Sequence, residues 1–113
     1  MPNPVTAELG PLAVSLGEVK AFLRIETDAE DALIAGFIRT GTALCEAFIG
    51  AALIGGVEAM ATDWNGIPEP LRQGIIRLAA HLFTHRDAAD AGPPPTAVAA
   101  LWRPWRRLRM GGS

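Results

Sequence analysis

The chain has 113 residues, with ten basic and twelve acidic side chains and a formal net charge of −2. This length suits one domain with a real core and leaves little room for a deep catalytic cleft. Half of the residues are hydrophobic but only 6% are aromatic, so Ala, Leu, Ile and Val dominate the apolar content. Because Ala and Leu favour helices, we expect one mainly α domain over residues 1–113.

Charge is distributed unevenly along the chain. Residues 1–63 carry nine acidic and three basic side chains, whereas residues 64–113 carry three acidic side chains and seven arginines. This polarity suits head-to-tail packing of copies, although a chance difference between the two ends of a small domain explains it equally well.

Composition also bears on where the protein resides. The single cysteine, Cys45, excludes an internal disulfide, and the first ten residues lack the basic and apolar segments of a signal peptide. The longest uncharged run in the middle, 47–57, is much shorter than the roughly 20 apolar residues that cross a bilayer. We therefore expect a soluble, cytoplasmic protein that does not associate with membranes.

The first elements in chain order are an arm and a short helix. Residues 1–14 contain three prolines and no sustained pattern, which predicts an extended N-terminal arm. Ser15 and Glu18 have the spacing of a capping box, so a short helix is expected from Leu16 to about Arg24.

A long second helix follows. Thr27 or Asp28 is expected to cap it, the apolar residues along it recur in steps of four and seven, and Gly50 is a natural stop. Gly36 and Gly41 lie inside this helix and cost about 1 kcal/mol each relative to Ala. Close approach of another backbone would explain both glycines.

The second half contains a less regular stretch and two more helices. Residues 57–62 could form a short strand. Pro68 and Pro70 start a third helix that should end near residues 87–89. A short helix over residues 96–102 should end at Pro104, with residues 105–110 extended. We thus expect a bundle of three to four helices over 15–103, with at most a short strand pair and a C-terminal tail over 104–113.

The sequence offers no support for an enzyme. His81 and His85 could face one metal from the third helix, but no third ligand accompanies them, so no metal site is expected. The acidic cluster Glu26, Asp28, Glu30 and Asp31 lacks the pattern of a calcium loop and fits a helix start better. Cys45 lies on an apolar stripe and is expected to be buried and inert. No cofactor-binding motif occurs.

The most distinctive segment is the C-terminal one, in which two Trp and four Arg lie within eight residues. Trp and Arg are enriched at binding hot spots, which favours docking to a protein. Two alternatives remain open: binding of nucleic acid through phosphate contacts and stacking, or packing of the Trp side chains on the domain's own helices.

Five segments in order carry a resemblance to a known family. They are residues 14–25 (VSLGEVKAFLRI), 28–35 (DAEDALIA), 45–50 (CEAFIG), 67–82 (IPEPLRQGIIRLAAHL) and 98–106 (VAALWRPWR). The chain resembles the small head–tail connector, or adaptor, proteins of long-tailed phages. It looks closest to those encoded by the gene transfer agents of alphaproteobacteria.

The resemblance implies a structural subunit. Such connectors form a ring, commonly of about twelve copies, between the portal of a DNA-filled capsid and the stopper or tail proteins, and they continue the DNA channel. The protein would assemble in the cytoplasm and then belong to the phage-like particle, and double-stranded DNA would pass through without specific binding.

The resemblance also suggests which residues contact partners. The candidates for portal contact are Trp102, Arg103, Trp105, Arg106, Arg107 and Arg109. Glu26, Asp28, Glu30 and Asp31 would lie at the subunit interface or in the channel. The alternative function is a small helical nucleic-acid-binding or regulatory protein that uses its basic tail.

Overall fold

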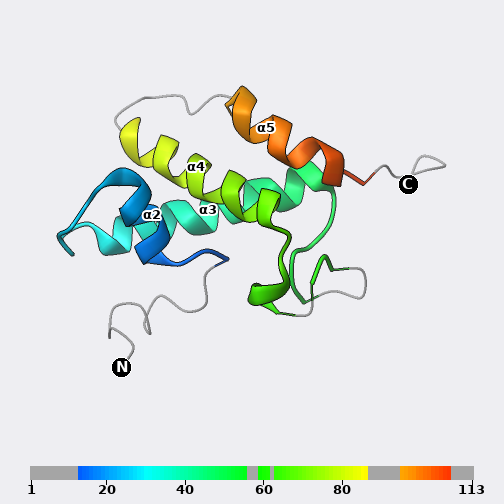
Figure 1. The fold of residues 1–113 in the computed structure, drawn as a ribbon, viewed down its shortest axis with the longest axis horizontal. Coiled ribbons are helices and arrows are strands. Elements are labelled where there is room, and N and C mark those ends of the chain that lie inside the picture. Colours follow the sequence, from blue (N-terminus) through cyan, green and yellow to red (C-terminus); the bar gives the residue numbers. More distant parts are fainter. Residues whose placement is uncertain (1–12, 56–58, 62, 87–94, 108–113) are drawn as a thin grey trace.

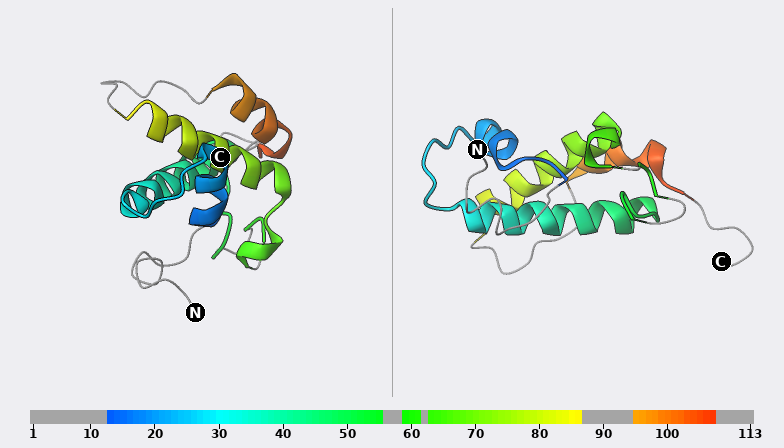
Figure 2. Two further views of the ribbon diagram at one scale, coloured as in Figure 1. Left: turned by 60° about the vertical axis from the view of Figure 1, so that its left-hand side comes forward. Right: turned by 90° about the horizontal axis from the view of Figure 1, so that it is seen from below.

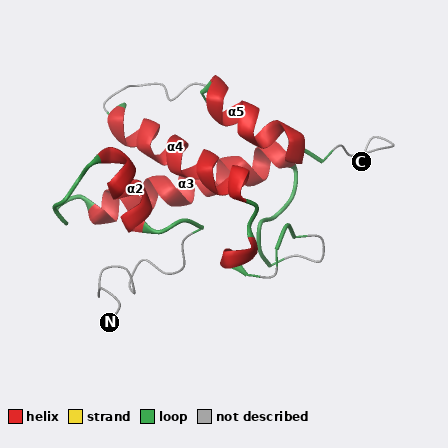
Figure 3. Cartoon of the chain, in the orientation of Figure 1, coloured by secondary structure: helices red, strands yellow, loops and turns green. Residues whose placement is uncertain are grey.

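The computed structural model describes residues 13–55, 59–61, 63–86 and 95–107. These residues form α2 (Leu16–Leu23), α3 (Asp31–Ile49), η1 (Trp64–Gly66), α4 (Glu69–Thr84), α5 (Thr96–Trp102) and η2 (Arg103–Trp105), where η denotes a 3₁₀ turn (Figure 1). The described residues contain no strand (Figure 3). The expectation of a mainly α bundle is therefore confirmed.

Helix α2 begins where the capping box predicts. The Ser15 hydroxyl accepts a hydrogen bond from the Glu18 backbone N–H at 3.0 Å, and the Glu18 carboxylate accepts one from the Ser15 N–H at 2.9 Å. This reciprocal pair satisfies two backbone donors that a helix start leaves open. The helix ends at Arg24, which adopts a left-handed conformation with φ of 61°.

Helix α3 begins later than expected, and the predicted cap at Thr27 or Asp28 is wrong. The helix starts at Asp31 and has no side-chain cap. The carboxylate of Asp28 instead pairs with Lys20 on α2 at 2.8 Å. The predicted stop at Gly50 is confirmed, with φ of 75° in the left-handed region that glycine tolerates best.

Helix α4 is the central element and contacts α2, α3 and α5 (Figures 1 and 2). Pro70 lies in its first turn, where a missing N–H costs nothing. The helix ends at Thr84, before the expected end at 87–89, which lies outside the described residues. The Arg86 guanidinium donates to the Phe83 carbonyl at 2.8 Å and so satisfies one acceptor of the last turn.

Helix α5 has the predicted bounds, but the segment predicted to be extended from residue 105 begins within a turn. A 3₁₀ turn, Arg103–Trp105, continues the helix through Pro104, because proline fits the first turn of such a segment. The Arg106 N–H closes this turn on the Arg103 carbonyl at 3.1 Å. Only Arg106 and Arg107 are extended, and residues 108–110 lie outside the described part of the chain.

Hydrogen bonds hold the loop between α3 and α4, and its described residues form no strand. The N–H groups of Met60 and Ala61 donate to the carbonyls of Ala52 and Leu53, both at 3.0 Å. Leu53 is fully buried and its N–H donates to the Glu46 carboxylate at 2.9 Å. Burial of Leu53 thus anchors the loop on α3. Of the residues 57–62, for which the sequence allows a short strand, 57, 58 and 62 lie outside the described residues.

The core lies between α3 and α4 and is closed by α2 and α5. Its fully buried members include Ile34, Ile38, Leu71, Ile75 and Trp102. Ala13 and Val14, at the end of the predicted N-terminal arm, are also buried in this core. Residues 1–12 lie outside the described part of the chain.

Candidate partner-binding surfaces

Trp102, one of the expected portal contacts, lies inside the chain's own core. Its side chain is fully buried, and its Nε1–H donates to the Leu71 carbonyl at 3.3 Å. The Phe48 ring lies 5.9 Å from it between ring centroids. A buried indole usually finds such a partner for its N–H. Trp102 therefore anchors the C-terminal segment and has no exposed surface for a partner. Of the alternatives from the sequence, packing on the domain's own helices holds for this residue.

The three described arginines of the tail are exposed. The Arg106 guanidinium lies over the Phe48 ring at 5.5 Å from its centroid, and the Arg107 backbone N–H donates to the Ile49 carbonyl at 2.7 Å. The structure therefore places Arg106 and Arg107 at the C-terminal end of α3, and Arg103 begins the 3₁₀ turn just before them. Guanidinium groups presented in this way suit bidentate binding of carboxylates or phosphates.

The remaining members of the predicted tail set fall in different places. Trp105 is half-buried and packs against the core. Arg109 lies outside the described residues. The tail surface that the structure describes is therefore arginine-rich, with its tryptophans turned mainly inward.

The predicted acidic cluster is largely paired with bases. Lys20 Nζ lies 2.8 Å from an oxygen of Asp28 and 2.9 Å from one of Asp31, and Glu30 lies 3.7 Å from Arg86. The carboxylates raise the pKa of Lys20 through hydrogen bonds, and Lys20 lowers the pKa of Asp28 in the same way.

Within this cluster Asp31 is buried and Glu26 is exposed. The Asp31 Oδ1 makes no well-aligned hydrogen bond, so its ion pair with Lys20 is what compensates its burial. The surface charge at this end of the molecule is therefore smaller than the four carboxylates alone suggest.

A further ion-pair network joins α2 to α4, and sequence reasoning missed it. Arg72 binds both Glu18 oxygens, at 2.7 and 2.6 Å, and one Glu69 oxygen at 3.0 Å. Burial raises the pKa of Glu18, but hydrogen bonds from Ser15 and Arg72 outweigh it and hold that pKa below its usual value. Because 54 positions separate Arg72 from Glu18, no local pattern could reveal this contact.

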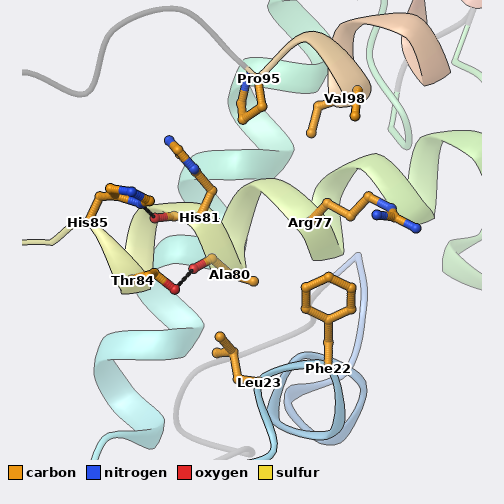
Figure 4. A pocket seen from close by; sticks show the side chains of 10 residues that line it. Phe22, Leu23, Arg77, Ala80, His81, Thr84, His85, Pro95 and Val98 are labelled. Atoms are coloured by element: carbon orange, nitrogen blue, oxygen red, sulfur yellow. Dashed lines mark hydrogen bonds between the residues drawn. The ribbon is translucent and has the colours of Figure 1, made fainter.

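An apolar groove opens between α2, α4 and α5 (Figure 4). It has a volume of about 310 Å³, and Phe22, Leu23, Ala80, Pro95, Ala97 and Val98 form its apolar lining. Arg77 lies over the Phe22 ring at 5.7 Å, and none of the described residues that line the groove carries a carboxylate. An apolar floor with basic groups at its edge suits an apolar partner that carries acidic side chains.

His81 and His85 border this groove and stack on each other, with ring centroids 4.2 Å apart. The Nδ1 atom of His85 lies 2.9 Å from the His81 carbonyl, so that nitrogen is already engaged with the helix. Within the described ranges no third His, Cys, Asp or Glu joins them. The pair is therefore part of the groove edge.

Cys45 is fully buried on the α4-facing side of α3. Burial, with a smaller contribution from Glu46, raises the pKa of its thiol to about 12. A thiol with so high a pKa is a poor nucleophile.

Helix α3 stands out by length and composition. Its 19 residues, Asp31–Ile49, are long and apolar enough to cross a membrane by those two criteria. One side of it packs on α4 through buried residues such as Ile34, Ile38 and Cys45. That packing explains the apolar character of this side only.

Comparison with known proteins gave one match. A family model described as a phage gp6-like head-tail connector protein matches residues 13–91, the region that holds α2, α3 and α4. Helix α5 and the arginine-rich tail lie beyond the matched region. Comparisons with curated proteins and with solved structures gave no match.

Proposed function

The chain belongs to the phage gp6-like head–tail connector family, and we propose that it joins a DNA-filled head to a tail as one of several copies in a ring. The family is structural and places the protein at the head–tail junction of a virion. In our proposal the ring, of about twelve copies, assembles in the cytoplasm and continues the channel through which double-stranded DNA passes.

The order and spacing of the five sequence segments supports a finer proposal. We assign the protein to the connectors of gene transfer agents in alphaproteobacteria. Its partners would then be the portal protein of the head and the stopper or tail proteins.

The observation that carries the docking proposal is the exposure of Arg103, Arg106 and Arg107 on a tail pinned to the end of α3. In this proposal these arginines, with Arg109, bind acidic groups of the portal, and Trp102 acts by holding the tail in place. Trp105 would contribute through its exposed part. Charge-assisted pairs of this kind fix orientation as well as affinity.

The acidic segment is proposed to face a neighbouring subunit or the channel. Glu26 and Asp28 are exposed, whereas Asp31 is buried and paired. A negative channel wall makes no phosphate-neutralising contacts, so DNA would slide along it without binding.

Charge reversal in the tail tests the docking proposal better than its removal, because deletion from Leu101 onward would also take Trp102 out of the core. The test variant is Arg103→Glu with Arg106→Glu. The matched control is Arg24→Glu, an exposed arginine distant from the tail. We expect the test variant to fold, as judged by circular dichroism, and to lower the yield of joined particles at least tenfold, while the control leaves it unchanged.

Two results would contradict the proposal. One is an unchanged yield of joined particles with the test variant. The other is salt-sensitive DNA binding by the purified chain that the same variant abolishes, which would favour the nucleic-acid-binding alternative.

A further inference from the structure

The outer side of α3 carries a row of large apolar side chains. Leu33 and Leu44 are each 40% exposed, whereas Phe37 and Phe48 in the same row are half-buried, with their rings against Phe83 and Trp102. The positions follow the helical spacing i, i+4, i+11 and i+15, so they share one side of the helix. Exposed apolar side chains that share one side of a helix are candidates for an interaction surface.

A second row, of small residues, runs beside the first. It consists of Ala32, Gly36, Ala43 and Ala47. Gly36 is the informative member, because a Cβ atom added there would meet nothing within 4 Å. Glycine inside a helix lowers stability relative to Ala. Nothing in the described part of this chain compensates that loss.

The other interior glycine of α3 shows the contrast. A Cβ atom on Gly41 would lie 3.6 Å from the Ile75 carbonyl oxygen and 3.9 Å from the Ala79 nitrogen, so the α4 backbone passes close by. Gly41 is thus accounted for within the chain and Gly36 is not. By the same reasoning, a backbone from outside the chain would approach at Gly36.

The groove between α2, α4 and α5 provides a matching surface. Phe22, on its edge, is 50% exposed, and the described residues contain only two other exposed large apolar side chains, Leu33 and Leu44. One interface between the groove and the outer side of α3 would bury all three. It would also bring Arg77 of one copy toward the exposed Glu26 of another.

The two surfaces face opposite ways. In Figure 4 the groove lies in front of α4 and α3 runs behind it. Figure 2 shows α3 along one side of the molecule and α2 along the other. Two different, complementary patches on opposite sides of one chain generate a head-to-tail series that closes into a ring if the rotation allows.

We propose that the outer side of α3 in one copy packs against the α2–α4–α5 groove of a second copy of this chain, with the closest approach at Gly36. This inference rests on the proposed function, in which several copies assemble, and it names the two surfaces through which they do so.

The first test uses Gly36→Ala and, as a matched control, Gly17→Ala on α2, where an added Cβ atom would meet only the Ser15 hydroxyl at 3.8 Å. Both substitutions should raise the urea midpoint of the dilute monomer. Gly36→Ala alone should weaken self-association, measured by sedimentation equilibrium, at least tenfold. A drop in the urea midpoint for Gly36→Ala would overturn the inference, because a segment of the same chain would then cover that site.

The second test cross-links mixed cysteine variants. Leu44→Cys and Phe22→Cys chains are mixed and treated with a short bismaleimide, and Cys45 stays in place because its buried thiol does not react. We expect dimers in the mixture and none with the wild-type chain. Dimers of Leu44→Cys alone would indicate a symmetric α3–α3 contact and overturn the inference. A chain that stays monomeric but floats with phosphatidylcholine vesicles would also overturn it, because the outer side of α3 would then bind lipid.

Particle joining separates this inference from the function on which it rests. Absence of the mixed cross-link in particles that still join heads to tails would overturn the inference alone. Formation of the mixed cross-link in a chain that plays no part in joining would overturn the proposed function alone.

Discussion

The indole of Trp102 lies over Gly74, in the space that any side chain at position 74 would fill. A Cβ atom added to Gly74 would clash with Trp102 Nε1 and with two carbons of the same ring. The indole N–H then reaches the Leu71 carbonyl, one helical turn before Gly74. The docking of α5 on α4 therefore depends on a glycine that appears, from sequence alone, to weaken α4.

Gly74→Ala should destabilise the fold even though Ala is the better helix former. The new methyl group would displace Trp102 or shift the α4 backbone, and overpacking of this kind costs about 1–3 kcal/mol. Urea unfolding followed by tryptophan fluorescence measures the change. Gly17→Ala, the same substitution on exposed α2, should instead stabilise the protein. Equal effects of the two substitutions would show that Trp102 is not tightly held.

The fold should tolerate removal of residues 108–113, but it should lose stability when Trp102 is removed as well. A chain of residues 1–107 keeps the buried indole, whereas a chain of residues 1–101 loses it, and emptying a buried Trp site costs about 3–5 kcal/mol. Thermal unfolding by circular dichroism compares the two. If both truncated chains unfold at the same midpoint temperature as the full chain, the core does not depend on Trp102.

Stability should fall in acid partly through Glu18. Its pKa is held below the usual value of 4.5, so its contribution is complete above about that pH and is lost as the pH falls through the lower pKa of the folded state. Glu18→Gln should flatten this part of the pH profile of unfolding. Glu26→Gln, which removes an exposed carboxyl, should leave it unchanged, and an identical flattening by both would contradict the role of Arg72.

Cys45 should resist thiol reagents in the folded protein. Burial raises its pKa to about 12, so almost no thiolate forms near neutral pH. Labelling with Ellman's reagent should be negligible in buffer and complete in denaturant. An added cysteine at exposed Ala100 on α5 provides the positive control, and fast labelling of native wild-type protein would show that α3 opens readily.

Local signals predicted the helices well. The Ser15–Glu18 capping box, the stop at Gly50 and the bounds of α5 are all confirmed. These features depend on residues within one or two turns of each other, which is the range that propensity and capping describe.

The errors arise from contacts between distant residues. Asp28 pairs with Lys20 on α2 instead of capping α3, and Trp102 occupies the space that a side chain at Gly74 would fill. Of the candidate sites, the tail arginines were visible in the sequence, whereas the groove was not, because it forms only when three helices are placed together. The partner roles of these residues stay predictions.

The hydrogen bond from the Arg107 N–H to the Ile49 carbonyl has a mechanical consequence. It lies where α3 ends and the tail leaves, and the tail runs so close to Gly50 that an added Cβ atom there would sit 3.2 Å from the Arg107 carbonyl oxygen. A pull on the tail would therefore load the end of α3 through this hydrogen bond, in parallel with α5 through the backbone. Tension at one end of α3 and contact along its outer side would then act on the same helix.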